Sequence, residues 1–197
     1  MSAPRLILAS ASPRRQQLLT EAGYTFGVCP ASIDESIVPP NLAPGDVAEY
    51  LARRKAEVVA ERFPDDVILA ADTVVAHGPT LLGKPTDPAD ARRMLGLLSG
   101  TTHSVITGVA VVHATAGFQR HARVVSSVHM RPLTDAEITR YVASRDWEGK
   151  AGGYGIQDPD PFVTRTSGCH TNIVGLPMTT TASLLRAAGI TPSAPPP

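Results

Sequence analysis

Continuous apolar runs along the chain predict its strands. Residues 6–9 form one such run, and residues 67–75 form a longer, valine-rich run that Asp72 interrupts. Runs of this kind are typical of strands buried on both faces of an α/β sheet. Residues 103–113 and 118–130 are two further β-prone stretches with a short glycine-containing segment between them, and they predict an antiparallel hairpin.

Stretches with apolar residues at every third or fourth position predict the helices. Ser12 and Pro13 suit the N-cap and the first helical position of the earliest one, and Thr134 and Glu137 have the spacing of a capping box. We expect the apolar faces of these helices to point inward. The predicted helices cover residues 13–22, 44–63 and 88–98, a segment that begins after Thr134, and a terminal segment that ends before Gly189.

Length, charge and cysteine content narrow the class of protein. The 197 residues fit a single domain, which we place at residues 1–190, followed by a proline-rich tail at 191–197 that cannot pack a core. Eighteen basic and eighteen acidic side chains balance, which argues against binding to long nucleic acid or to an anionic membrane. The two cysteines form no disulfide framework, and no run of eighteen apolar residues occurs. We therefore expect a cytoplasmic protein whose polyanion partner, if it has one, is small.

The first strand gives way to the first helix within four residues, and this junction gathers groups that bind anions. Ser10, Ser12, Arg14 and Arg15 surround the free backbone N–H groups of the new helix. A helix N-terminus favours an anion, and arginine forks match phosphate oxygens in charge and shape. The segment is therefore interpreted as a phosphate cradle, with an ordinary capped helix and solvated arginines as the alternative.

Two charged residues occupy positions that the pattern assigns to the interior. Asp72 interrupts a buried strand, where a carboxylate is costly unless it is paired, protonated or bound to a metal. Lys55 lies on the apolar stripe of the predicted helix 44–63, so it either reaches an inward anion or snorkels to the edge. Asp72 is therefore the first candidate for chemistry.

Residues 78–85 nearly match the P-loop pattern but do not complete it. Pro85 stands where that pattern needs the hydroxyl residue that holds Mg²⁺, and it removes a backbone N–H group. The next helix begins only at Asp87, so Lys84 does not lie at a helix N-terminus. We therefore reject a Walker motif and keep Lys84 as a loop lysine able to meet a phosphate as a point charge. A P-loop-like nucleotide kinase stays an alternative function, against which Pro85 argues.

Two further loops hold candidate residues. Asp34 and Glu35 are adjacent acids, which are usually solvated, and we retain them as candidate ligands because Mg²⁺ takes one or two carboxylates together with waters and substrate oxygens. Glycines around Tyr154 allow close approach of the backbone to a ligand, and the amide of Gln157 can read both a donor and an acceptor on a base edge.

Five short motifs occur along the chain: SASPRR (10–15), ADTVV (71–75), GKP (83–85), KAGGYGIQ (150–157) and VGLP (174–177). Each is weak alone, but they occur in the order of one family and together resemble the Maf family of nucleoside triphosphate pyrophosphatases. The resemblance implies an α/β fold of the Maf/ITPase type, with an elongated mixed sheet flanked by helices and an active cleft between two lobes. It also implies hydrolysis of a nucleoside triphosphate to the monophosphate and pyrophosphate with a divalent cation (Mg²⁺ or Mn²⁺), often in a homodimer.

The same resemblance assigns roles to individual residues. It makes Asp72 the proton acceptor that activates water, with Glu35 as a second residue of the metal site. The remaining assignments are Ser12, Arg15, Lys55 and Lys84 for the triphosphate, which Ser10 of the phosphate cradle joins, and Arg14, Thr73 and Gln157 for selection of the nucleotide. These last three residues resemble the branch that acts on dTTP and UTP rather than the branch that acts on 7-methyl-GTP.

Two segments beside Gln157 depart from the family pattern, at residues 147–149 and 158–161. They leave the choice among pyrimidines open. A regulator of septum formation that binds nucleotide without turnover is the alternative function, because the family has been linked to cell division. The complete polar set, with Asp72 inside its strand, argues against that alternative.

Overall fold

The computed structural model describes residues 4–158 and 162–193. Within these ranges the strands are β1 (Leu6–Leu8), β2 (Phe26–Val28), β3 (Val67–His77), β4 (Thr80–Leu82), β5 (Thr102–His113), β6 (Phe118–Met130) and β7 (Val163–Ser167). They form one sheet in the order β2-β1-β3-β5-β6-β7, and β4 pairs with β3. β1 runs parallel to β2 and β3, and the other pairs are antiparallel. The predicted mixed α/β sheet is therefore confirmed.

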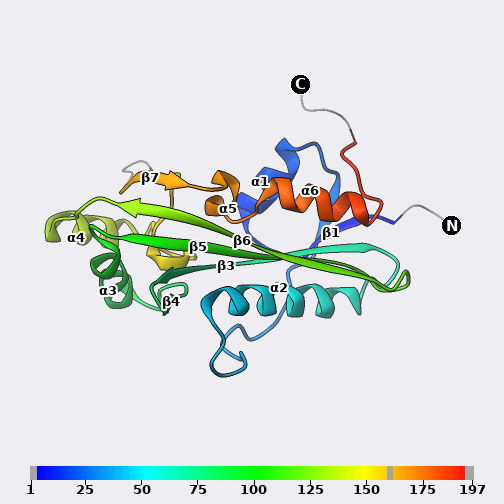
Figure 1. Cartoon of the computed structure of the whole chain (residues 1–197), viewed down its shortest axis with the longest axis horizontal. Helices are drawn as coiled ribbons and strands as arrows, with labels where there is room; N and C mark the ends of the chain where they lie inside the picture. Colours follow the sequence, from blue (N-terminus) through cyan, green and yellow to red (C-terminus); the bar gives the residue numbers. More distant parts are fainter. Residues whose placement is uncertain (1–3, 159–161, 194–197) are drawn as a thin grey trace.

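Helices cover both faces of this sheet (Figure 1). α2 (Pro44–Ala60) lies along one face, and α1 (Pro13–Glu21), α5 (His170–Val174) and α6 (Met178–Ala187) lie on the other. α3 (Pro88–Leu98) and α4 (Asp135–Ser144) lie at one end of the long strands, and the short helix η1 (Ala151–Gly153) contacts α3. The long strands β3, β5 and β6 give the molecule its elongated shape (Figure 1).

Side chains alternate along β3 and fill two separate cores. Val67 and Leu69 pack on the side of α1 and α6, while Ile68 and Ala70 pack against the alanines of α2. Burial on both faces explains why this strand is a continuous apolar run. The backbone of α2 approaches β5 closely at Gly108, where a Cβ atom would lie 2.4 Å from the carbonyl oxygen of Ala48.

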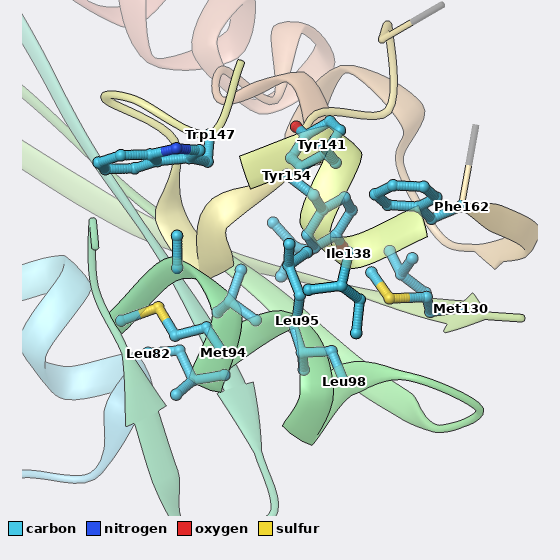
Figure 2. Packing of buried hydrophobic residues seen from close by; sticks show 14 residues of the cluster. Leu82, Met94, Leu95, Leu98, Met130, Ile138, Tyr141, Trp147, Tyr154 and Phe162 are labelled. Carbon is cyan, nitrogen blue, oxygen red and sulfur yellow. The ribbon is translucent and has the colours of Figure 1, made fainter. Parts of the chain in front are cut away.

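A third core closes the end of the molecule that carries α3 and α4 (Figure 2). Leu95 and Leu98 of α3 share it with Ile138 and Tyr141 of α4. Large side chains from β6 and from the segment after α4 complete this core, namely Met130, Trp147, Tyr154 and Phe162. The core therefore fixes the glycine-rich segment that precedes residue 158 to the rest of the protein.

Most predicted bounds agree with the structure. β6 and α3 have the predicted limits, and the Asp87 carboxylate caps α3 by accepting a hydrogen bond from the Asp90 N–H group at 2.8 Å. The capping box at Thr134 is present. The helix predicted over 44–63 ends earlier, at Ala60, and Ser12 takes the N-cap position of α1 without a hydrogen bond from its side chain to the helix.

The sequence patterns do not predict β4, β7 or α5. Residues 78–82 form the turn and return strand of a β3–β4 hairpin, in which Gly78 has a φ of 57° and Val75 pairs with Leu82. Lys84 therefore follows a strand rather than beginning a helix, in agreement with the rejection of a P-loop.

Ser193 connects the start of the proline-rich tail to the body of the protein. Its N–H group donates to the carbonyl oxygen of Gly23 at 2.9 Å, and its hydroxyl lies 2.9 Å from that of Thr25. Residues 194–197 of the tail lie outside the described residues, as do residues 159–161 of the segment 158–161 that departs from the family pattern. No helix in the described ranges combines the length and the apolarity needed to cross a membrane.

Candidate active site

One cleft of about 750 Å³ brings together every residue predicted for the site except Asp34. The cleft opens at one edge of β3, in the gap between β1 and β4, the two strands that pair with that edge. β1 pairs with β3 only as far as Leu69, and β4 pairs with it only from Val75 onward. Asp72 and Thr73 lie in this gap. The predicted residues that line the cleft are Ser10, Ser12, Arg14, Arg15, Glu35, Lys55, Asp72, Thr73, Lys84 and Gln157.

Lys55 lies between two carboxylates at the inner end of the cleft. Its Nζ donates to Oδ1 of Asp72 at 2.6 Å and lies 2.7 Å from Oε1 of Glu35. Lys84 approaches the other oxygen of Glu35, with Nζ 3.0 Å from Oε2. The side chain of Lys55 is 8% exposed and that of Lys84 is 52% exposed. The inward orientation of Lys55 is thus established, and Lys84 remains open to a ligand.

The burial of Lys55 follows from the local sequence. The residue lies on the face of α2 that carries Ala52 and Ala56, both fully buried, and these small side chains leave room for the lysine stem. Asp72 shares the α2 face of β3 with Ala70 and Val74, because side chains alternate along a strand. The helix stripe and the strand alternation therefore direct the ammonium and the carboxylate toward each other.

Two lysines keep the carboxyl group of Glu35 ionised. Burial favours the neutral acid, but the hydrogen bond and charge of Lys55, followed by those of Lys84, outweigh it and lower the pKa of Glu35 to about 2. The neighbouring acid Asp34 does not line the cleft and instead caps a turn, accepting from the Ser36 N–H group at 2.9 Å. Glu35, rather than Asp34, is therefore the loop acid of the site.

The two arginines of the first motif differ in their contacts. The guanidinium of Arg15 donates to Oγ of Ser10 at 3.1 Å, to Oγ1 of Thr73 at 3.1 Å and to the carbonyl oxygen of Gly175 at 2.8 Å. Burial lowers the pKa of Arg15, and the charge of Asp72 opposes this effect. Arg14 makes no hydrogen bond or ion pair with the described part of the chain. Arg15 therefore ties the first motif to β3 and to the α5–α6 connection, while Arg14 is available to a ligand.

Sequence reasoning missed the polar network that supports Thr73. The Thr73 hydroxyl lies 2.9 Å from that of Thr107 on β5, and Thr107 donates to the carbonyl oxygen of Asn172 at 3.3 Å. The buried amide of Asn172 in turn donates to Oγ of Ser126 at 2.9 Å. Thr107 faces Thr73 because these residues are paired in the β3–β5 register, and no local sequence pattern encodes that pairing.

Comparison with known proteins identifies the family. Residues 5–188 match the family model described as "Maf-like protein". The chain belongs to the Maf-like protein family. Among curated Maf-like relatives, proteins named "dTTP/UTP pyrophosphatase" from Cereibacter sphaeroides and Sphingopyxis alaskensis are each 49% identical, and one from Cupriavidus metallidurans is 45% identical. These alignments cover 94–95% of this chain and 95–98% of the relatives.

A solved structure, a HAM1 protein from Coxiella burnetii, aligns with this Maf-like protein at a TM-score of 0.40 and 16% identity, over 64% of this chain and 73% of that one. So distant a likeness bears on neither substrate nor mechanism.

Proposed function

We propose that this Maf-like protein hydrolyses dTTP and UTP to the nucleoside monophosphate and pyrophosphate. The observation that carries the proposal is the shared ammonium of Lys55, which holds Asp72 and Glu35 together in the cleft lined by the first motif and by Gln157. The names of the relatives, which align over nearly their whole lengths, support the choice of substrates.

In the proposed reaction, Asp72 accepts the proton of the water that attacks the α-phosphorus, and the bond between that phosphorus and the oxygen that bridges to the β-phosphate breaks. The hydrogen bond from Lys55 fixes one carboxylate oxygen of Asp72, so the other oxygen remains to orient the water. Breakage of the P–O bond leaves negative charge on pyrophosphate. Positioned cations stabilise such charge as it develops, and we assign this role to Lys55, Lys84 and Arg15, with Ser10 and Ser12 as hydrogen-bonding groups.

The carboxylates fit a divalent cation, and we propose Mg²⁺ or Mn²⁺ as the cofactor. The described residues contain no cluster of three or more histidine, cysteine or acidic side chains of the kind that holds a metal by itself. Mg²⁺ takes one or two carboxylates and completes its shell with waters and phosphate oxygens, so Glu35 and Asp72 would hold it only together with substrate. When bound, the cation supplies positive charge to the phosphates.

We assign selection of the nucleotide to Arg14, Thr73 and Gln157. Gln157 is exposed in the cleft, and its amide makes no hydrogen bond to the described residues. Thr73 contacts Arg15 and Thr107, so its contribution passes through the position of Arg15. Arg14 and Gln157 are the side chains available to meet the nucleotide directly.

A panel of nucleoside triphosphates with Mg²⁺ or Mn²⁺ tests the proposed function. We expect dTTP and UTP to yield monophosphate and pyrophosphate faster than CTP, ATP and GTP do. Formation of diphosphate would refute the assigned cleavage position. Binding of dTTP and UTP without any product would favour the non-catalytic regulator instead.

We also propose that the protein works as a homodimer in the cytoplasm and binds neither long nucleic acid nor membranes. The zero net charge supports the last part. Light scattering of the purified chain tests the dimer, which a monomeric mass would refute.

A further inference from the structure

The carboxylate of Asp158 lies at the base of the turn that carries Gln157, and both of its oxygens are engaged. Lys150 Nζ donates to Oδ1. The hydroxyl of Tyr141 and the N–H group of Gly155 donate to Oδ2, the latter at 2.7 Å. The Asp158 side chain is only 11% exposed. Three donors thus hold one largely buried carboxylate, which joins α4, the start of the glycine-rich loop and its last turn.

The same residue closes the turn from both ends. The Asp158 N–H group donates to the carbonyl oxygen of Gly155 at 3.3 Å, while the Gly155 N–H group donates to the Asp158 carboxylate. A Cβ atom on Gly155 would lie 2.7 Å from Oδ1 of Asp158. The absence of a side chain at position 155 therefore makes room for the carboxylate, and Gln157 is held within a four-residue turn that is fastened at each end.

The pairing with Asp158 also distinguishes the role of Lys150 from that of Lys55 and Lys84, the lysines assigned to the triphosphate. Its side chain is 15% exposed and its ammonium is paired with Asp158, whereas the side chain of Lys84 is 52% exposed. A tyrosine hydroxyl is a neutral donor at pH 7, and burial, followed by the hydrogen bond to Asp158, raises the pKa of Tyr141 further. Lys150 and Tyr141 therefore serve the turn rather than the triphosphate.

We infer that Asp158 is a positioning residue for nucleotide selection, because its carboxylate fastens the turn that presents Gln157 to the base. This inference rests on the proposed function. A turn that is already ordered loses less conformational entropy when the nucleotide binds than a loose loop would lose. Loss of the carboxylate should therefore weaken the part of binding that depends on the base and leave the part that depends on phosphate unchanged.

The test compares Asp158→Asn and Tyr141→Phe with the unaltered protein. Asp158→Asn removes the charge that pairs with Lys150, and Tyr141→Phe removes one donor while it keeps the packed ring. Asp65→Asn is the matched control, because Asp65 is exposed and lies outside the cleft. Steady-state kinetics with UTP and CTP give kcat and KM, and inorganic tripolyphosphate, a probe without a base, gives an inhibition constant against UTP.

We expect Asp158→Asn to raise KM for UTP by about threefold to tenfold, the cost of ordering one or two side chains. The preference for UTP over CTP should fall by a similar factor, while kcat and the inhibition constant of tripolyphosphate stay within about twofold. Tyr141→Phe should act in the same direction but less strongly, and it decides the question if Asp158→Asn does not fold.

Equal weakening of UTP and tripolyphosphate would overturn the inference, because it would indicate general loosening of the cleft. An unchanged KM and an unchanged preference for UTP would overturn it as well. Failure of the unaltered protein to hydrolyse UTP is a distinct result, which would refute the proposed function and this inference with it.

Discussion

Lys55 on α2 and Asp72 on β3 form a buried ion pair, with Nζ 2.6 Å from Oδ1 and each side chain 8% exposed. A buried pair of this kind gains little over apolar packing, but removal of one partner leaves an uncompensated charge. Glu35 contacts the same ammonium from the more exposed side of the cleft. A role in holding reactive groups in place therefore explains this ion pair better than a role in stability alone.

Replacement of Lys55 by methionine should lower both stability and turnover. The free energy of unfolding should fall by about 3 kcal/mol, since Asp72 remains buried without its partner. Addition of Asp72→Asn to this variant should recover part of the loss, because the uncompensated charge is removed. Urea unfolding of the single and double variants measures the loss of unfolding free energy and its partial recovery. Equal stability of the two variants would contradict the assigned pairing.

Replacement of Lys84 by alanine should separate function from stability. Its contact with Glu35 is half exposed, so the free energy of unfolding should change by less than about 1 kcal/mol. Turnover should fall by about a hundredfold or more if Lys84 stabilises charge on the leaving group. Arg92→Ala, which breaks an exposed ion pair with Asp135 outside the cleft, is the control. A decrease of only a few-fold would return Lys84 to the role of a solvated loop lysine.

The buried His103 predicts a dependence of stability on pH. Burial, and then the charges of His77 and His129, lower the pKa of His103 from 6.5 to about 4. As the pH falls, His103 therefore binds a proton near pH 6.5 in the unfolded chain but only near pH 4 in the folded protein. The contribution to stability is complete above pH 6.5 and is lost as the pH falls toward 4.

Unfolding by urea between pH 7 and pH 4 checks this expectation. The ring of His103 shares a hydrogen bond with the Tyr154 hydroxyl through Nε2. His103→Gln keeps a polar group beside that hydroxyl but removes the titration, so its stability should fall less steeply over the same range. His170→Gln, at an exposed position, should follow the unaltered protein. Identical slopes for His103→Gln and the unaltered protein would contradict the assignment.

The sequence predicted those features of the fold and the site that are marked by a local pattern, or by a residue that interrupts one. Lys55 and Asp72 stand out because a charge interrupts an apolar stripe or run, and both prove to be buried and paired. The limits of α3 and β6 follow from a capping aspartate and from a β-prone stretch. Such signals are local, so a single sequence reveals them.

The remaining features depend on contacts between distant segments. Thr107 supports Thr73 only through the register of β3 and β5, and Asp158 meets Tyr141 only because α4 packs beside the glycine-rich loop. β4 is a three-residue strand next to a turn, which hydrophobic periodicity cannot distinguish from a loop. Arg15 was predicted to contact phosphate, but its donors to Ser10, Thr73 and Gly175 appear only in the folded chain.

The central claim is that Asp72 accepts a proton from the attacking water. Its most direct test is pyrophosphate release from UTP by Asp72→Asn, measured together with urea unfolding. Asp66→Asn is the matched control, because Asp66 is also a buried, ion-paired aspartate but lies outside the cleft. We predict that Asp72→Asn folds and loses turnover by at least about a hundredfold, while Asp66→Asn loses stability and keeps its turnover. A folded Asp72→Asn protein that retains most of its turnover would contradict the claim.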